Sequence, residues 1–195
     1  MCAKSRQEQK EERRQKILMT ALTLFVQKGY ADTKIADIAA AVPMSTGLMF
    51  HYFESKEVLL TELVKMGAEG TKMVGEGAAL SKDVPPDKFL EGFLGQLFSY
   101  AKAQPWVFTM FVLMGQARRP GMPEEARQIA LSVDSIQSTA KMIKAGQKAG
   151  VFRKGDPALL SLCFWSAVQG IMEEMFIDPD MTPPDSEWLV DMIRA

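Results

Sequence analysis

The chain has 195 residues, of which 47% are hydrophobic and 24% charged, the balance of an ordinary globular protein with enough apolar material for a sizeable core. It has no run of about 18 uncharged apolar residues, and its charged N-terminus lacks the apolar stretch of a secretory signal, so we expect neither a membrane span nor export. The net charge of −1 is unevenly spread, because residues 1–56 carry nine Lys and Arg against six Asp and Glu, whereas residues 57–195 carry fourteen against eighteen.

The basic residues near the N-terminus are open to two interpretations. A basic N-terminal part followed by an acidic remainder favours binding of the N-terminal part to phosphates. The run Lys10, Arg13, Arg14 and Lys16 is interleaved with glutamates, which is typical of a solvated helix face, and its first residues equally suit an arm on backbone phosphates. Charge alone therefore leaves nucleic-acid binding open.

Three helices with a tight turn between the last two are predicted near the N-terminus. Apolar residues at helical spacing predict the first helix over residues 8–28. Thr33 is expected to cap a short second helix, which ends before Val42–Pro43 because proline biases the preceding residue away from helical geometry. Ser45 is a suitable cap for a third helix that ends near His51. This order is typical of a helix-turn-helix.

The rest of the chain also has helical patterns and no convincing strand. Ser55 is expected to open a fourth helix to Met66, followed by a loose Gly-rich tract over 67–77. The remaining helices are expected after Pro85–Pro86, from Pro105, over 124–149 as one long amphipathic helix, over 158–176 and over 186–194. We therefore predict an all-α protein, with a three-helix DNA-binding domain over 1–56 and a larger helical ligand-binding and dimerisation domain over 57–195.

Several residues around the third helix are chemically suited to DNA. The backbone N–H groups at residues 45–47 favour a phosphate or a base acceptor, and Gly47 lets the backbone come close to the groove wall. Leu48 or Met49 can touch a thymine methyl group, and Thr33 and Lys56 are expected to hold flanking phosphates. The candidate DNA-binding residues from this reasoning are Thr33, Ser45, Thr46, Gly47, Leu48, Met49 and Lys56.

Many residues at fixed spacing between Arg13 and Leu59 carry a family resemblance. They are Ile17-Leu18, Ala21, Leu24-Phe25, Gly29-Tyr30, Thr33, Ile38-Ala39, Ser45, Gly47, His51-Tyr52-Phe53 and Ser55-Lys56-Glu57. This set resembles the TetR family of bacterial repressors. The resemblance implies a helix-turn-helix repressor that binds a palindromic operator as a homodimer, and a variable C-terminal domain that binds an inducer and holds the dimer together.

Three positions depart from the family pattern. The family usually has Gly in the turn where this chain has Pro43, and because Pro cannot take the positive φ that Gly can, we expect a differently built turn. Met44 replaces a small Val. Phe50 stands where the family has a phosphate-binding Tyr, so we add Tyr52 and His51 to the candidates as replacements. His51 is equally compatible with a plain surface residue.

Large flexible and aromatic residues of the C-terminal part are candidates for an effector pocket, since pockets between helices are mostly apolar with few polar groups. These candidates are Phe89, Phe93, Trp106, Met110, Met114, Met142, Trp165, Gln169, Met172 and Glu173. Each apolar one is also compatible with plain core, and Glu173 with a solvated carboxylate. We find no nucleophile–base pair and no metal-ligand pattern, so we expect no enzymatic activity, no cofactor and no metal.

The helix over 158–176 is apolar on two sides and must bury both. One stripe contains Leu160, Phe164, Ala167, Ile171 and Met175, and a second contains Leu159, Leu162, Cys163 and Ser166. The small residues Ser166, Ala167 and Gly170 allow close approach of a second helix. The candidate dimerisation residues are Leu160, Phe164, Ala167, Gly170, Ile171 and Met175. In the resembling family the last two long helices of each subunit form a four-helix interface. We expect Cys163 to be a buried small hydrophobe, and its distance in sequence from Cys2 fits a reducing cytoplasm without disulfides.

These observations predict a cytoplasmic repressor, not bound to membranes, that binds double-stranded operator DNA as a homodimer and responds to a small apolar or amphipathic effector. Two alternatives stay open. One is a helical ligand carrier or small enzyme with a degenerate DNA-binding head, which Pro43 and Phe50 favour. The other is a helical protein that serves interactions only. Specific operator binding separates both from the repressor.

Overall fold

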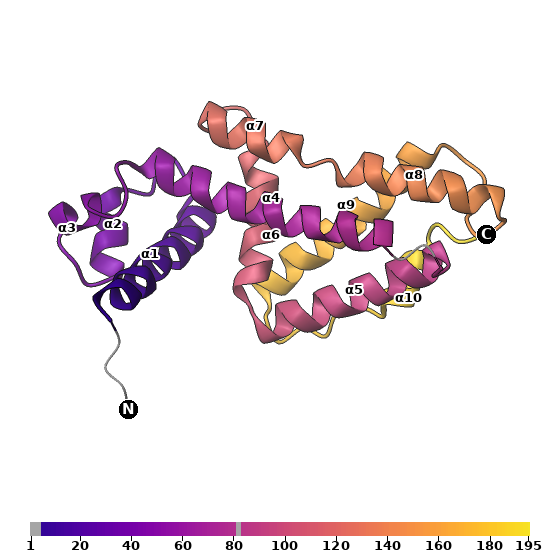
Figure 1. Ribbon diagram of the computed structural model, residues 1–195, viewed down its shortest axis with the longest axis horizontal. Helices are drawn as coiled ribbons and strands as arrows, with labels where there is room; N and C mark the ends of the chain where they lie inside the picture. Colours follow the sequence, from indigo (N-terminus) through magenta and orange to yellow (C-terminus); the bar gives the residue numbers. More distant parts are fainter. Residues whose placement is uncertain (1–4, 81–82) are drawn as a thin grey trace. The chain divides into compact units, whose positions relative to one another are not determined.

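The computed structural model describes residues 5–80 and 83–195 as a succession of helices (Figure 1). The helices are α1 (Arg6–Lys28), α2 (Ile35–Ala41), α3 (Thr46–Phe50), α4 (Lys56–Leu80), α5 (Pro86–Ala103), α6 (Trp106–Ala117), α7 (Glu124–Ser132), α8 (Ser135–Lys148), α9 (Pro157–Ile177) and α10 (Ser186–Asp191). In this described part the only β-type pairing is an isolated bridge between Phe152 and Arg194. The all-α prediction is therefore confirmed. No helix among these residues combines the length and apolar character of a membrane span.

The chain forms two compact units. The head unit comprises Met1–Met66 and Leu113–Ala130, and the body unit comprises Gly67–Val112 and Leu131–Ala195. The helices α4, α6 and α7 each continue from one unit into the other. The domain boundary expected after Lys56 stays a prediction, because compactness alone does not say which part functions by itself.

The head unit is built on one face of α1. Ser5 caps this helix in a capping box with Glu8, so α1 begins slightly before the predicted start. Residues at helical spacing on α1 are fully buried, and the following helices add their own apolar residues to the same core. The largest buried side chains of the head are Ile17, Leu18, Leu22, Phe25, Ile38, Met49, Phe53, Leu59 and Leu60.

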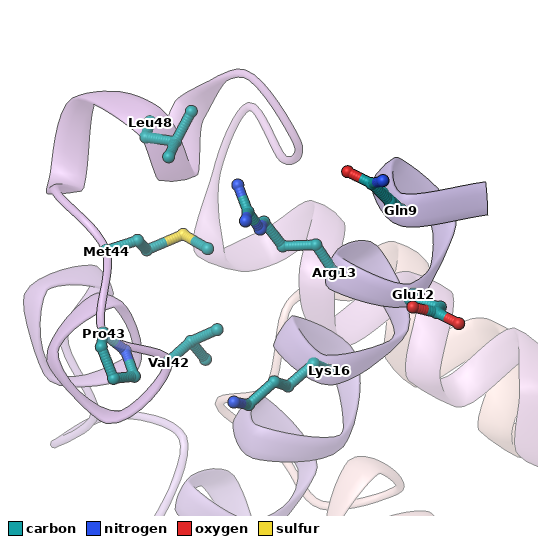
Figure 2. Close-up of a pocket in the computed structure, with 8 residues that line it drawn as sticks. All are labelled: Gln9, Glu12, Arg13, Lys16, Val42, Pro43, Met44 and Leu48. Atoms are coloured by element: carbon teal, nitrogen blue, oxygen red, sulfur yellow. The ribbon is translucent and has the colours of Figure 1, made fainter. Parts of the chain in front are cut away.

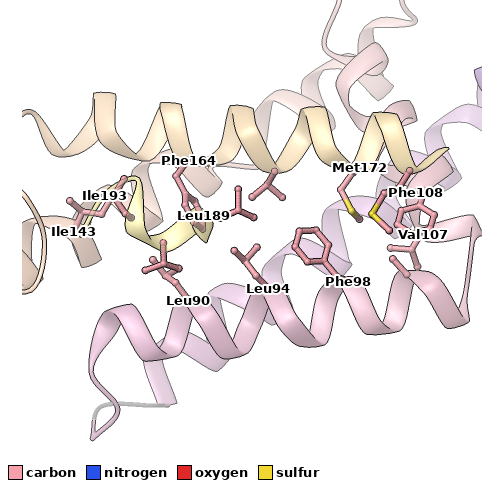
Figure 3. Packing of buried hydrophobic residues seen from close by; sticks show 14 of the residues in the cluster. Leu90, Leu94, Phe98, Val107, Phe108, Ile143, Phe164, Met172, Leu189 and Ile193 are labelled. Atoms are coloured by element: carbon pink, nitrogen blue, oxygen red, sulfur yellow. The ribbon is translucent and has the colours of Figure 1, made fainter. Parts of the chain in front are cut away.

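The body unit has its core between α5, α9 and α10. Figure 3 shows Leu94 and Phe98 of α5 pointing toward Phe164 and Met172 of α9. Leu189 of α10 packs into the same cluster. Burying side chains of this size contributes about 1.5 to 3 kcal/mol each relative to leaving them in water, so this cluster dominates the stability of the unit.

Arg194, near the C-terminus, forms ion pairs with carboxylates of α5. Its guanidinium pairs with Glu91, and it lies 3.5 Å from the Asp87 carboxylate and 3.6 Å from that of Glu187. Hydrogen bonds from Lys88 and from Arg194 lower the pKa of Glu91 below its usual value. These contacts hold α10 on the body core although α10 has only six residues.

Two predicted elements of the body are wrong. The Gly-rich tract over 67–77 is not a loop, because α4 runs through it to Leu80. Each Gly costs about 1 kcal/mol relative to Ala in a helix, but these glycines stand among good helix formers and no proline interrupts them. The single helix predicted over 124–149 is two helices, because Asp134 turns its side chain to the backbone N–H of Gln137, at 2.9 Å, and caps α8.

Candidate nucleic-acid interface

The helix α3 is short, and it is capped as predicted. The Ser45 side chain accepts a hydrogen bond from the backbone N–H of Leu48 at 3.2 Å, which confirms Ser45 as the N-cap. The helix ends at Phe50, where the backbone N–H of His51 returns to the Leu48 carbonyl. With five residues, α3 has little more than one turn.

The residues of α3 divide into one that faces the core and four that face outward. Met49 is fully buried in the head core, so its predicted contact with a base edge is wrong. Leu48 is 36% exposed and Phe50 is 50% exposed, while Thr46 and Gly47 are exposed as well. The sequence indicates only that Phe50 lacks the hydroxyl of a tyrosine, and it does not reveal that this large apolar side chain is exposed.

Thr33 is turned inward. Its side chain is fully buried, and its hydroxyl lies 2.8 Å from the Gly29 carbonyl oxygen and 3.2 Å from that of Leu24. Lys34, not Thr33, is the N-cap of α2. The predictions of a cap and of a phosphate contact at Thr33 are therefore corrected, because the hydroxyl bonds to the end of α1 instead.

Lys56 joins the start of α4 to the turn after α1. Its ammonium donates to the Tyr30 carbonyl at 2.9 Å and to the Ala31 carbonyl at 3.3 Å, and it lies 4.3 Å from the centre of the Tyr30 ring. Burial raises the pKa of the Tyr30 phenol, and the nearby Glu57 carboxylate raises it further. Two of the three ammonium donors of Lys56 thus serve the fold, which leaves one for a phosphate.

The turn between α2 and α3 keeps a positive φ at Pro43, with a value of 22°. The expectation that proline excludes a positive φ at this position is therefore wrong. A proline ring holds φ near about −65°, so the turn is strained at this residue. The adjacent backbone bond from the Met44 N–H to the Ala39 carbonyl, at 2.9 Å, holds the turn in place.

A groove of about 490 Å³ lies beside α3 in the head unit (Figure 2). One wall comes from α1, where the Arg13 side chain extends toward Leu48 and Lys16 lies lower on the same helix. The other wall is apolar and is formed by Val42, Pro43, Met44 and Leu48. Neither Arg13 nor Lys16 forms an ion pair with another described residue, so both cations are free for an anionic partner.

The basic run on α1 therefore divides by role. Arg14 points into the protein, where its guanidinium pairs with the Glu62 carboxylate and lies 4.9 Å from the centre of the Phe53 ring. Arg13 and Lys16, three positions apart, share the groove side of the helix. That spacing was visible in the sequence, but the glutamates at positions 8, 11 and 12 made the whole run resemble a solvated helix face. His51 is exposed and Tyr52 is half-buried beside this surface.

The candidate effector residues fall into both units. Met114 belongs to the head unit and the other nine to the body unit. Phe93 of α5 and Trp165 of α9 lie together, with ring centres 6.3 Å apart, and the Gln169 amide donates to the Phe111 carbonyl at 3.2 Å and to Glu173 at 2.8 Å. Met172 is part of the closed core, Trp106 is 36% exposed, and the shallow pocket at Phe98 and Lys102 contains none of the ten.

The dimerisation candidates on α9 need a correction. Phe164 and Met175 are fully buried in the core of their own unit, and Leu160, Ala167 and Ile171 pack against that core. The exposed stripe is the second one, with Leu159 and Leu162 61% and 45% exposed. The other exposed residues on this stripe are Cys163, Ser166 and Gly170. Cys163 is therefore an exposed thiol and not the buried hydrophobe that we expected.

Comparison with known proteins finds sequence similarity in the N-terminal part of the chain. A family model described as bacterial regulatory proteins of the tetR family matches residues 17–63. The HTH-type transcriptional repressor KstR2 of Rhodococcus jostii is 38% identical over 56 residues, which are 29% of this chain and 28% of that protein. The chain thus spans less than a third of the length of the curated relatives that match this segment.

Solved structures extend the similarity of fold to nearly the whole chain. The MbdR regulator from Azoarcus sp. CIB superposes with a TM-score of 0.79 and 21% identity, over 92% of this chain and 95% of that one. A transcriptional regulator from Saccharomonospora viridis, solved in complex with choline, superposes with a TM-score of 0.65 and 22% identity, over 95% of this chain and 99% of that one. Identities at this level show a shared fold.

Proposed function

We propose that this chain, a member of the TetR family by its helix-turn-helix domain, is a cytoplasmic transcriptional repressor that binds a palindromic operator as a homodimer. The observation that carries the proposal is the outer surface of the head. Four of the five residues of α3 face outward, and the groove beside α3 is lined by Arg13 and Lys16, which form no ion pair among the described residues, together with Glu12. An exposed recognition helix next to free positive charge suits the major groove and its flanking phosphates.

The DNA contacts in this proposal differ from the full set of candidates. Thr46, Gly47 and Leu48 of α3 face the bases, with Phe50 added. Ser45, His51, Tyr52 and Lys56 lie around them, and Arg13 and Lys16 hold backbone phosphates. Met49 and Thr33 are left out because both are buried.

The homodimer in this proposal uses the exposed stripe of α9. Leu159 and Leu162 are large apolar side chains in water, and Ser166 and Gly170 follow on the same stripe, where small residues allow close approach of a second helix. Two copies joined in this way present two recognition helices. Binding to successive major grooves requires a separation of about 34 to 36 Å between them.

The effector in this proposal is a small molecule that binds the body and shifts the population of dimers away from the DNA-binding separation. The regulator of similar fold that holds choline supports a ligand site in a body of this kind. A ligand must prefer one state by about 5.5 kcal/mol to move the equilibrium from 1:99 to 99:1. The aromatic pair Phe93 and Trp165 is the place where we expect the apolar part of the effector to bind.

The proposal is tested by selection from a random double-stranded DNA library with the purified full chain at two salt concentrations. We expect enrichment of a sequence with two-fold symmetry. Arg13→Ala should weaken binding to all sequences and reduce the slope of log K against log salt by about one contact. Lys154→Ala, which removes an exposed cation of the body, serves as the control and should leave the slope unchanged. No enrichment at either salt concentration would contradict the proposal.

A further inference from the structure

The outer face of α3 is poor in hydrogen-bonding groups. Its sequence from Thr46 to Phe50 contains no Arg, Lys, Asn, Gln, Asp or Glu, which are the residues that read guanine, adenine and cytosine through paired hydrogen bonds. The Thr46 hydroxyl is its only polar side-chain group. If α3 enters the major groove, it has to distinguish base pairs mainly by apolar contact.

The geometry of the helix places two apolar side chains on either side of a glycine. Successive residues of an α-helix are rotated by about 100°, so with Met49 directed into the core, Leu48 and Phe50 lie on its two flanks. Gly47 then lies almost opposite Met49, on the outermost line of the helix. Leu48 and Phe50 are 36% and 50% exposed, so each flank carries a large apolar group in water.

Gly47 is not required by the packing of the head. A Cβ added at this position meets no atom within 4 Å, so the fold has room for a side chain. Its absence leaves the backbone bare at the outermost line of α3. A bare backbone between two apolar side chains suits a partner that approaches closely and presents methyl groups on both sides.

The charge beside α3 identifies that partner as DNA. Arg13 and Lys16 line the groove that adjoins Leu48 and form no ion pair in the described part of the chain. A duplex provides phosphates at its rim and, in the major groove, one apolar group among the base edges, the C5-methyl of thymine. A hydrophobic protein partner has no use for the two cations at the rim.

We propose that Leu48 and Phe50 read thymine C5-methyl groups, so that each operator half-site carries thymines in the base pairs that face α3. The inference rests on the proposed function and specifies the bases that this site selects. Phe50 thereby becomes a residue that determines specificity, although it lacks the hydroxyl of the tyrosine that the family usually has there.

The test replaces the thymines of the selected half-site by deoxyuridine, one at a time, and measures the affinity of the full chain by fluorescence anisotropy. Deoxyuridine pairs as thymine does and lacks only the methyl group. Loss of one buried methyl contact should weaken binding about fourfold. Cytosine at a contacted position should weaken binding further, and 5-methylcytosine at that position should recover part of the loss.

Variants assign the methyl groups to side chains. Leu48→Ala should make the affinities for thymine and deoxyuridine equal at the position that Leu48 contacts, and Phe50→Ala should do so at the position that Phe50 contacts. Each variant should keep the difference in affinity at the other position. Leu131→Ala and Tyr100→Ala are matched controls, because Leu131 and Tyr100 are 38% and 54% exposed and lie on other helices. Both control variants should keep the full difference in affinity between thymine and deoxyuridine.

The outcomes separate this inference from the function on which it rests. The methyl readout would be overturned if thymine and deoxyuridine gave equal affinity at every position, or if the selected half-site contained no thymine. Neither result would contradict operator binding itself. A library that yields no enriched sequence would overturn the proposed function itself, and the methyl readout with it. The comparison of thymine with deoxyuridine uses the unaltered protein, so it holds even if a variant fails to fold.

Discussion

Pro43 adopts a backbone angle that its own ring opposes. Its φ of 22° lies far from the value near −65° that the pyrrolidine ring favours. Two backbone hydrogen bonds hold the residues on either side, from the Val42 N–H to the Ile38 carbonyl at 3.1 Å and from the Met44 N–H to the Ala39 carbonyl at 2.9 Å. The surrounding structure therefore imposes the angle, and the strain is stored in the turn that orients α3.

Replacement of Pro43 by Gly should stabilise the protein. Gly takes positive φ without a steric penalty, and relief of the strain outweighs the greater entropy of the unfolded chain. We expect a gain of about 1 to 2 kcal/mol in the free energy of unfolding, measured by urea denaturation. Pro85→Gly is the matched control, because Pro85 has an ordinary φ of −54° and its replacement should not stabilise. A loss of stability in Pro43→Gly would show that the turn is not strained.

The direction of single side chains in short elements is the part of the site that sequence could not predict. Ser45 was identifiable as a cap because its preference is local and chemical. Met49 and Leu48 are neighbours of similar character, and a helix of five residues offers too little periodicity to decide which one faces the core. Thr33 looks like a cap in sequence, but the carbonyls of Leu24 and Gly29 compete for its hydroxyl.

At the scale of elements, α9 shows where a sequence pattern is sufficient and where it is not. Its bounds were predictable from Asp156 as cap and Pro157 in the first turn. Its two apolar stripes were visible as well. The pattern does not say which of the two stripes is buried within the body unit, because both contain large apolar residues. In the structure, α5 and α10 pack against the stripe that contains Phe164 and Met175.

The exposed stripe of α9 makes a direct prediction for assembly. Leu162→Glu places a charge on a surface that must lose water when two copies join, so this variant should sediment as a monomer at concentrations where the unaltered chain sediments as a dimer. Leu131→Glu changes a similarly exposed leucine on another helix and should stay dimeric. A dimeric Leu162→Glu would exclude this stripe as the interface.

The errors at α4 and at α7–α8 both concern where a helix ends, and each has its own physical cause. Glycines in 67–77 lowered the helical propensity of α4 without breaking it, because the good helix formers between them keep the summed propensity helical and no proline interrupts the segment. Between α7 and α8 the apolar periodicity continued, and the Asp134 side chain divides the helix by accepting a hydrogen bond from the Gln137 backbone N–H. Sequence patterns thus predicted which segments are helical and were less reliable about where helices end.

At the scale of the whole molecule, sequence was sufficient for the class of fold and for the presence of a helix-turn-helix, since both follow from many residues at fixed spacing. The division into units was not predictable in the same way. The head unit includes Leu113–Ala130, a segment far along the chain. No local sequence pattern in 113–130 indicates that it associates with residues 1–66. The helices α4, α6 and α7 continue from one unit into the other and give the proposed effector three direct covalent routes from the body to the head.

Binding of two heads as one dimer is best measured by the affinity of the full chain for its selected palindrome, compared with the same duplex that carries five extra base pairs between the half-sites. Five base pairs turn one half-site by about half a turn of B-DNA. A homodimer with two recognition helices at fixed separation predicts at least a hundredfold loss of affinity, with two protomers bound to the original duplex. Unchanged affinity after the insertion would contradict the account, because it would mean that the two heads do not bind as one dimer.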